Sequence, residues 1–287
     1  MKKFAVIDIG SNSVRLMFVA DGKVLYKRLN TTRLGEGLTT SPNLKMEAIE
    51  RSAVAVKEFA ELAKAEGAEN VYAFATAAVR FAKNGGDFVQ RVQEFCGLTV
   101  EVIAGETEAE IGIMGALGDK DGAVIDIGGA STEIVVRQNN TILYKKSVDI
   151  GVVRLKDMCG KDGDKLTKTA LEYVALFGEV PQNVVLHGIG GTATTLGALA
   201  LGLQEYDSNK VTGFELTAKK MQELSEKLLH MSVDEIAQMP CVPKGRADVL
   251  TGGAVLLNVL MKQLGFDKII ISDRDNLEGY AIRNGWM

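Results

Sequence analysis

The six residues AVIDIG stand at Ala5–Gly10 and again at Ala123–Gly128, 118 positions further along a chain of 287 residues. At the same offset, ten of the 24 residues of Ala5–Arg28 are identical in Ala123–Lys146, without a gap. A period this long that occurs twice indicates two related domains, because solenoid repeats are much shorter. We therefore expect an internal duplication to decide the fold.

Each copy predicts a three-stranded antiparallel unit. An apolar, β-branched strand ends at a small-residue turn, and two more apolar strands follow, separated by Asp21-Gly22 or Asn139-Asn140. Helical periodicity then alternates with short apolar runs in both halves. The expected helices are 42–67, 86–96, 106–117, 165–176, 192–201, 217–230, 246–264 and 276–283. The expected later strands are 70–75, 98–103, 183–186 and 268–271.

This order of elements predicts a mixed α/β fold with two domains. The short polar stretch Gly118–Gly122 is the expected boundary, which gives domains at 1–118 and 119–273. The long helix near the end of the chain suggests that the chain crosses back, so that 274–287 completes the first domain.

Composition limits the class of protein. Apolar residues make up 46% of the chain and charged residues 24%, with only four prolines, which is typical of folded domains. No apolar run reaches the roughly 18 residues of a membrane span, and Asp8 comes too early for a signal peptide. We expect a soluble, cytoplasmic protein without a membrane partner.

Cysteine, histidine and net charge exclude further classes. Three widely spaced cysteines predict free thiols, and two histidines exclude a histidine-rich metal site. A net charge of −4 argues against broad nucleic-acid binding, but it allows a local basic cleft for a polyanion.

The small residues after each AVIDI strand predict phosphate-binding loops. In Asp8-Ile9-Gly10-Ser11-Asn12-Ser13 and Asp126-Ile127-Gly128-Gly129-Ala130-Ser131-Thr132, backbone N–H groups can approach an anion closely, and hydroxyl groups lie beside them. One such turn could be an ordinary hairpin, but two matched copies favour function. His187-Gly188-Ile189-Gly190-Gly191-Thr192 follows a strand and opens a helix, which is typical of an anion site at a helix N-terminus or of a plain tight turn.

Charged residues near these loops complete the expected site. Arginine suits phosphate, and Arg80 is the favoured candidate because it follows a strand and a run of small residues. The further candidate arginines are Arg15, Arg33 and Arg154. The acidic groups beside the loops, Asp8, Asp126 and Glu133, could hold Mg²⁺.

A water molecule that attacks phosphorus also needs a base. Glu106, Glu108 and Glu110 open one predicted helix, and their spacing alone does not choose among them. Acidic residues in a first helical turn can also serve only to stabilise the helix dipole.

Seven motifs now resemble one family in order along nearly the whole chain. They are AVIDIGSNSVRL (5–16), ATAAVRFAKNG (75–85), VIAGETEAEIGIMGAL (102–117), VIDIGGASTEIVV (124–136), DIGVVRL (149–155), HGIGGTATTLGAL (187–199) and GRADVLTGGA (245–254). The family is that of the exopolyphosphatases and guanosine pentaphosphate phosphatases (Ppx/GppA), which have the ribonuclease H-like actin/hexokinase/Hsp70 superfold.

The resemblance implies two domains with the active site in the cleft between them. It implies hydrolysis of the terminal phosphoanhydride of inorganic polyphosphate, or removal of the 5′-phosphate of guanosine pentaphosphate (pppGpp), with Mg²⁺ or Mn²⁺ as cofactor and a homodimer as the assembly. It gives Glu108 the role of catalytic base, Arg80 that of the conserved arginine, and Asp126 and Glu133 a role in holding metal or water. The residues expected to bind phosphate are Gly10, Ser11, Asn12, Ser13, Arg15, Gly128, Gly129, Ala130, Ser131, Thr132, Gly190, Gly191 and Thr192.

Three departures from the family pattern are visible. Ala130 replaces a loop glycine, at a cost of about 1 kcal/mol if that position needs a positive φ. Phe81 stands where the family often has aspartate, which could change the orientation of Arg80. The chain also lacks the further helical domains of long family members, so a preference for shorter polyphosphate is plausible.

Two other functions remain open at this point. An ATP-dependent small-molecule kinase of the same superfold would consume ATP only with an acceptor. A non-catalytic binder of polyphosphate or (p)ppGpp would bind without turnover, and the presence of Glu108, Asp126 and Glu133 argues against it.

Overall fold

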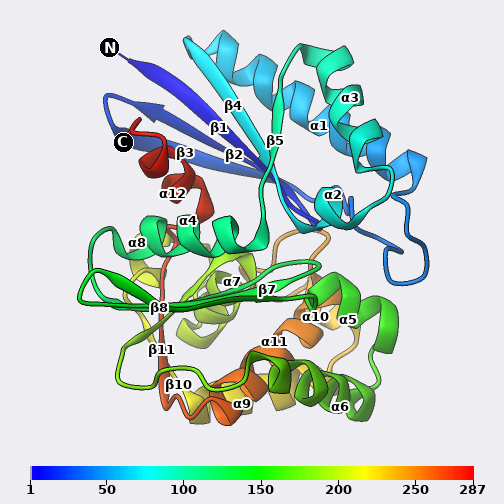
Figure 1. Ribbon diagram of the computed structural model, residues 1–287. Helices are drawn as coiled ribbons and strands as arrows, with labels where there is room; N and C mark the ends of the chain where they lie inside the picture. The colour runs from blue at the N-terminus through cyan, green and yellow to red at the C-terminus, as the bar shows by residue number, and fades with distance from the viewer. Residues whose placement is uncertain (1) are drawn as a thin grey trace.

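The two copies of the repeat form two β-sheets in the computed structural model, which describes residues 2–287 (Figure 1). The first sheet contains β1 (Lys3–Ile9), β2 (Val14–Ala20), β3 (Lys23–Asn30), β4 (Asn70–Ala75) and β5 (Val100–Val102), in the order β3-β2-β1-β4-β5. The second contains β6 (Gly122–Ile127), β7 (Thr132–Gln138), β8 (Thr141–Val148), β9 (Leu186–Ile189), β10 (Glu215–Thr217) and β11 (Lys268–Ile271).

The second sheet repeats the strand order of the first. From its β8 edge it reads β8-β7-β6-β9-β11, with β10 added beyond β11. In both sheets the three strands of the repeat are antiparallel and the next two are parallel to the first strand. The predicted duplication and the two-domain α/β superfold are therefore confirmed.

The hairpin turns of the repeat adopt the expected conformation. Asp21 and Gly22 have φ of 50° and 74°, and Asn139 and Asn140 have φ of 52° and 59°. Positive φ at both central residues is typical of type I′ turns, whose twist matches that of the paired strands. The same local chemistry thus forms both hairpins.

Helices cover the outer faces of the two sheets (Figure 1). On the first sheet they are α1 (Met46–Ala65) and α3 (Gly85–Cys96), with the short α2 (Ala77–Phe81) at the end of β4. On the second they are α5 (Val152–Cys159), α6 (Gly163–Val174), α7 (Gly190–Leu201), α9 (Ala218–His230), α10 (Val233–Ala237) and α11 (Ala247–Gln263); the short α8 (Ser208–Val211) follows α7. None of the helices described is long and apolar enough to cross a membrane.

Two helices, α4 (Gly105–Leu117) and α12 (Asn276–Arg283), lie between the sheets (Figure 1). Ile111 of α4 packs in a cluster with β1 and with Leu277 and Tyr280 of α12, whereas Ala109 and Ile113 of α4 pack on the second sheet. Since α4 is covered on both sides, it positions residues between the two sheets.

The C-terminal helix therefore packs against the first sheet, as the expected crossing back requires. The division into 1–118 with 274–287, and 119–273, stays a prediction, which this packing supports.

Some elements differ from the predicted ones. The strand expected at 183–186 is β9 at Leu186–Ile189, because its pairing with β6 begins at Ala123 opposite Leu186. The remaining expected strands and helices form with bounds shifted by a few residues. Helices α2, α5, α8 and α10 and strand β10 were not expected, and all of them are short.

Candidate active site

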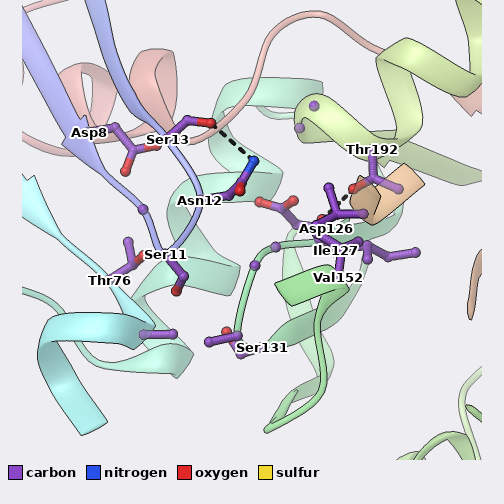
Figure 2. A pocket seen from close by; sticks show the side chains of 18 of the residues that line it. Asp8, Ser11, Asn12, Ser13, Thr76, Asp126, Ile127, Ser131, Val152 and Thr192 are labelled. Carbon is purple, nitrogen blue, oxygen red and sulfur yellow. Dashed lines mark hydrogen bonds between the residues drawn. The ribbon is translucent and has the colours of Figure 1, made fainter. Parts of the chain in front are cut away.

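A pocket lies where the loops of the two sheets face each other (Figure 2). Its lining residues are Asp8, Gly10, Ser11, Asn12, Ser13, Arg15, Thr76, Ala77, Glu108, Asp126, Ile127, Gly128, Gly129, Ala130, Ser131, Val152, Gly190, Gly191, Thr192, Arg246, Val249, Leu250 and Asn276. All predicted site residues belong to this lining except Arg80, Glu133 and Thr132. The fold thus brings the three glycine loops together at one place.

The first two loops have the same internal geometry. The N–H of Gly10 donates to the carbonyl of Ser13 at 3.0 Å, and the N–H of Gly128 donates to the carbonyl of Ser131 at 3.0 Å. The loops touch across the pocket, because a Cβ on Gly129 would lie 2.7 Å from Cβ of Ser11. This contact is why a glycine is needed at 129.

These loops offer unused donors to an anion. Within residues 2–287, no acceptor in the protein is found for the backbone N–H groups of Ser11, Asn12, Gly129 and Ala130. Amide groups gathered in such a turn bind phosphate oxygens. Ala130 does not adopt a positive φ, so the replacement of the family's glycine costs no backbone strain.

The third loop closes one side of the pocket. Gly190 has φ +73°, and a Cβ there would lie 2.4 Å from Oδ1 of Asp126, so only glycine fits. Thr192 donates its hydroxyl to the carbonyl of Ile127 at 2.9 Å (Figure 2), which ties the start of α7 to the second loop. Thr132 is outside the lining, and its hydroxyl donates to the carbonyl of Ile150 at 2.6 Å. The phosphate contact expected for Thr132 stays a prediction.

Glu108 is the glutamate of α4 that reaches the pocket. It is buried, and its Oε2 accepts a hydrogen bond from Nη1 of Arg80 at 3.1 Å. Glu106 and Glu110 instead lie outside and pair with Lys145 at 3.0 and 2.7 Å. Burial, and then the charge of Glu133, raise the pKa of Glu108 well above its ordinary value, although Arg80 acts in the opposite direction.

Asp126 and Glu133 form a second acidic group. They are partners in the β6–β7 pairing. Asn276 donates to Oδ2 of Asp126 at 2.8 Å, and Ser147 donates to Oε1 of Glu133 at 2.6 Å. Burial, together with the charge of Glu133, raises the pKa of Asp126 to about 8, and burial raises the pKa of Glu133 to about 7. Carboxyl groups this perturbed are typical of functional sites.

Arg15 lines the pocket, but its guanidinium already has two carboxylate partners. It donates from Nε to Oδ2 of Asp8 at 3.0 Å and forms an ion pair with Asp275. Although burial opposes it, Asp275 and then Asp8 raise the pKa of Arg15 well above its ordinary value. The charge of Arg15 is thus offset by two carboxylates of the protein, and the phosphate contact expected for it stays a prediction.

Arg246 is the arginine that faces the pocket without such partners. It lies against Gly191, where a Cβ would overlap its guanidinium, and its Nε is buried without a hydrogen-bond partner. It has no ion pair within residues 2–287. Burial, and then the nearby charge of Arg15, lower the pKa of Arg246 to about 10. A half-buried guanidinium without an ion pair, next to a glycine loop, is suited to a phosphate group.

The other candidate arginines lie outside the pocket. Arg33 pairs with Asp248 at 2.9 Å. Two guanidinium groups lie near the ring of Phe81, with centroid distances of 5.0 Å to Arg80 and 5.1 Å to Arg154. Phe81 therefore supports Arg80 by a cation–π contact in place of the family's aspartate.

The carboxylates fit a Mg²⁺ ion that shares its ligands with a substrate. No group of three or more His, Cys, Asp or Glu side chains within residues 2–287 is placed to hold a metal alone. Oδ1 of Asp8 and Oε2 of Glu133 are nevertheless buried without hydrogen-bond partners. Mg²⁺ takes one or two carboxylates and fills its remaining positions with water and phosphate oxygens.

Several pocket residues were not identified from the sequence. Arg246 lies in the motif GRADVLTGGA (245–254), but the pattern of residues in this motif indicated no role for it. Asn276 is the first residue of α12, and Asp275, which caps that helix, pairs with the pocket residue Arg15. Thr76 follows β4, and Ala77 is the first residue of α2. Thr76 and Ala77 stand in the quoted motif ATAAVRFAKNG, so the small residues around them were a usable signal, whereas the partners of Asp275 and Asn276 are distant in sequence.

Comparison with known proteins gives a consistent result. The model of the Ppx/GppA phosphatase family matches residues 17–284. Exopolyphosphatase 2 of Mycobacterium tuberculosis is 30% identical, over 98% of this chain and 98% of its own length. The crystal structure of the Aquifex aeolicus member of the Ppx/GppA family matches with a TM-score of 0.79 and 30% identity, over 99% of this chain and 97% of that one.

An exopolyphosphatase from Cytophaga hutchinsonii matches with a TM-score of 0.86 and 25% identity, over 100% of this chain and 99% of that one. Sequence and structure thus agree over the whole chain. The chain belongs to the Ppx/GppA phosphatase family and is a hydrolase that acts on phosphoanhydride bonds.

Proposed function

We propose that this protein is an exopolyphosphatase, which removes the terminal phosphate of inorganic polyphosphate. The observation that carries the proposal is the position of Glu108, a buried carboxyl group with a raised pKa that faces two repeat-related phosphate loops. Arg246 adds an unpaired positive charge at the other side of the same pocket. The similarity to named exopolyphosphatases supports this substrate.

The reaction proceeds by in-line attack of water on the terminal phosphorus. The N–H groups of the loops at 10–13 and 128–131 hold the oxygens of the terminal phosphoryl group, where charge develops in the transition state. Glu108 takes a proton from the water as the new P–O bond forms. The bridging P–O bond breaks, and its electron pair stays on the shortened chain, whose charge Arg246 offsets.

Mg²⁺, held by Asp126 and Glu133 with Asp8 beside them, would supply Lewis-acid charge that offsets the phosphate charge. Arg80 keeps Glu108 in place through their 3.1 Å contact and contributes positive charge near the attacked group. Arg15 fixes Asp8 and Asp275 at the pocket wall.

A second pocket next to the first favours pppGpp as a second candidate substrate. It shares Arg15, Gly190, Gly191 and Arg246 with the first pocket, so a phosphate group can lie at the junction. Its walls include the apolar or aromatic side chains of Leu29, Tyr206, Val242, Pro243 and Leu277. The apolar walls suit the base and sugar of a nucleoside, while Arg28 and Arg246 in the same pocket suit phosphate groups.

One assay tests both substrates. The purified chain with Mg²⁺ is offered long polyphosphate, tripolyphosphate, pppGpp and ATP in parallel, and released phosphate is measured. We expect release from polyphosphate without an acceptor. Release from none of these substrates would contradict the proposal, and ATP consumption that requires an acceptor would favour the kinase.

The homodimer, the cytoplasmic location and the use of Mn²⁺ in place of Mg²⁺ stay predictions. A sedimentation measurement would test the homodimer, and a comparison of the two metals in the same assay would test the use of Mn²⁺.

A further inference from the structure

Two pockets beside the central pocket lie at corresponding positions of the internal repeat. We call the pocket of Arg15, Lys27, Arg28, Leu29, Gly190, Gly191, Tyr206, Arg246, Asp273 and Asp275 the first mouth. We call the pocket of Arg80, Phe81, Gly105, Glu106, Lys145, Lys146, Ser147 and Asp149 the second mouth. At the repeat's offset of 118, the consecutive residues 27–29 of the first mouth correspond to 145–147 of the second.

The correspondence extends to the contacts. In the first mouth Lys27 of β3 pairs with Glu278 of α12 at 2.8 Å. In the second mouth Lys145 of β8 pairs with Glu106 and Glu110 of α4. Helices α12 and α4 each follow the last parallel strand of their sheet and begin at their mouth. The duplication has therefore given each half of the chain an equivalent pocket.

The two mouths differ in their access to the central pocket. The first mouth shares four lining residues with it. The second mouth shares none, and two side-chain contacts separate it from the interior. These are the 3.1 Å contact of Arg80 with Glu108 and the 2.6 Å hydrogen bond from Ser147 to Glu133.

The geometry of in-line displacement indicates which of the two mouths the leaving chain faces. The attacking water and the leaving chain lie on opposite sides of the phosphorus. The proposed base, Glu108, lies on the side of the central pocket nearest the second mouth, because it contacts Arg80, which lines that mouth. The leaving chain therefore points to the first mouth, where Arg246 and the third glycine loop lie.

We propose that the released orthophosphate leaves through the second mouth while the shortened chain stays in the first. The inference rests on the proposed exopolyphosphatase activity. A path on the side of Glu108 lets phosphate leave without passing the chain. It also lets the chain advance by one unit for the next cleavage.

The reaction itself loosens the barrier between the pocket and the second mouth. When water attacks, its proton goes to Glu108, and the ion pair of Glu108 with Arg80 becomes a contact with a neutral group. The free product carries about two negative charges and competes for Arg80. Arg80 can then turn from the carboxyl group to the phosphate that is leaving.

The second mouth has the positive charges that an exit path for an anion requires. Within residues 2–287, neither Lys146 nor Arg154 has an ion pair, and Arg154 lies over the Phe81 ring of this mouth. Two acidic residues also line the mouth, and Lys145 pairs with one of them, Glu106, while Asp149 is exposed. The unpaired cations thus lie beyond the barrier, on the outward path.

The test separates cleavage from release. The full chain with Mg²⁺ and polyphosphate labelled at its terminal phosphorus is followed by rapid quenching, which reports cleavage, and by a fluorescent phosphate sensor, which reports release. In Lys146→Glu, an exposed residue outside the interior contacts, we expect cleavage within about twofold of wild type and release at least about threefold slower. This delay should shrink at high salt, because exposed charges are then screened.

Arg28→Glu, the equivalent position in the first mouth, is the matched control. It should raise KM for polyphosphate and leave no delay between cleavage and release. Normal cleavage and release in Lys146→Glu would overturn the exit path, as would a delay in Arg28→Glu. A wild-type protein that cleaves no polyphosphate would overturn the proposed function and the exit path together, which distinguishes that failure from the others.

Discussion

At the scale of single residues, Glu108 is the side chain whose loss should cost the most activity. Glu108→Gln keeps the shape but removes the proton acceptor, and we expect phosphate release to fall by at least about 10²-fold. Glu106→Gln and Glu110→Gln, on the same helix but outside the pocket, should stay near wild type. Near-normal turnover in Glu108→Gln, with an unchanged circular dichroism spectrum, would remove Glu108 from the mechanism.

The protonation of Glu108 predicts the pH dependence of the reaction. Burial raises its pKa, and only the ionised carboxylate accepts a proton, so kcat/KM should increase as pH increases through that pKa. Arg80 stabilises the ionised form, so Arg80→Gln should move the rising part of the profile to higher pH. Arg154→Gln, which removes the other guanidinium on Phe81, should leave its position unchanged. Identical profiles for the two variants, at constant Mg²⁺, would contradict this coupling.

Substitution of Arg246 should weaken substrate binding without lowering the stability of the protein. Because hydrogen bonds to charged groups contribute about 1.5–3 kcal/mol, Arg246→Gln should raise KM for polyphosphate by about tenfold or more. The same change removes a half-buried charge without an ion pair, so the free energy of unfolding without substrate should be unchanged or higher. Urea unfolding and steady-state kinetics measure the two effects. Arg283→Gln, which removes an exposed ion pair with Glu101, should change neither KM nor the free energy of unfolding. If Arg246→Gln lost both stability and binding, Arg246 would have a structural role instead.

The sequence was informative about residues whose role is local. The loops after β1 and β6 were predictable because strand, turn and hydroxyl groups are consecutive. The pairing of Arg15 with Asp275 was not predictable, since 260 positions separate the two residues. The spacing of the three glutamates did not choose Glu108, which only the family resemblance selected; the structure gives the physical reason, since the second sheet covers one face of α4.

At the scale of elements, the crossing of α4 and α12 depends on two glycines. A Cβ on Gly115 would lie 1.9 Å from the carbonyl oxygen of Asp275, and a Cβ on Gly279 would lie 1.7 Å from that of Ile111. Either alanine substitution should therefore separate the helices and lower the free energy of unfolding by about 1–3 kcal/mol.

Gly86 in α3 is the control for that prediction. Nothing lies within 4 Å of its Cβ position, so Gly86→Ala should be neutral or stabilise the protein by up to about 1 kcal/mol. Urea unfolding measures all three variants. Equal stability of Gly115→Ala and Gly86→Ala would show that the helices adjust without cost.

Elements with strong periodicity were predictable, and short ones were not. The 20 residues of α1 carry a clear apolar face, and the alternation in β1 sends Ala5 and Ile7 to one side and Phe4 and Val6 to the other. Helices α2 and α5 have five and eight residues, too few for a period to be recognised. β9 was misplaced because its bounds depend on pairing with β6, which a local pattern does not contain.

At the scale of the whole molecule, the loop after β3 joins the first sheet to the second half of the chain. Its backbone supports the first phosphate loop, since the N–H of Arg33 donates to Asn12 and that of Gly35 to Ser11. On its other side, Arg33 pairs with Asp248, and Thr31 donates to the carbonyl of Lys244 at 3.1 Å. This connection holds the two walls of the pocket together in the absence of substrate.

Asp157 of α5 is the place to test this connection, because its Oδ2 accepts from the N–H of Gly37 at 3.0 Å and from Thr39 at 3.2 Å. Loss of these two exposed hydrogen bonds should open a fraction of the molecules, and apparent affinity falls in proportion to the fraction that stays closed. At about 0.5–1 kcal/mol each, they predict a rise in KM of up to about thirtyfold for Asp157→Ala with kcat nearly unchanged. Small-angle scattering should show a larger radius of gyration without polyphosphate and the wild-type radius with it, since substrate contacts both walls and favours the closed form.

Asp164→Ala is the control, because Asp164 is an exposed aspartate of α6 without an ion pair within residues 2–287. It should change neither KM nor the radius of gyration. An increase in KM without a change in radius would mean that Asp157 acts on the loop alone and that the closed form does not depend on this contact.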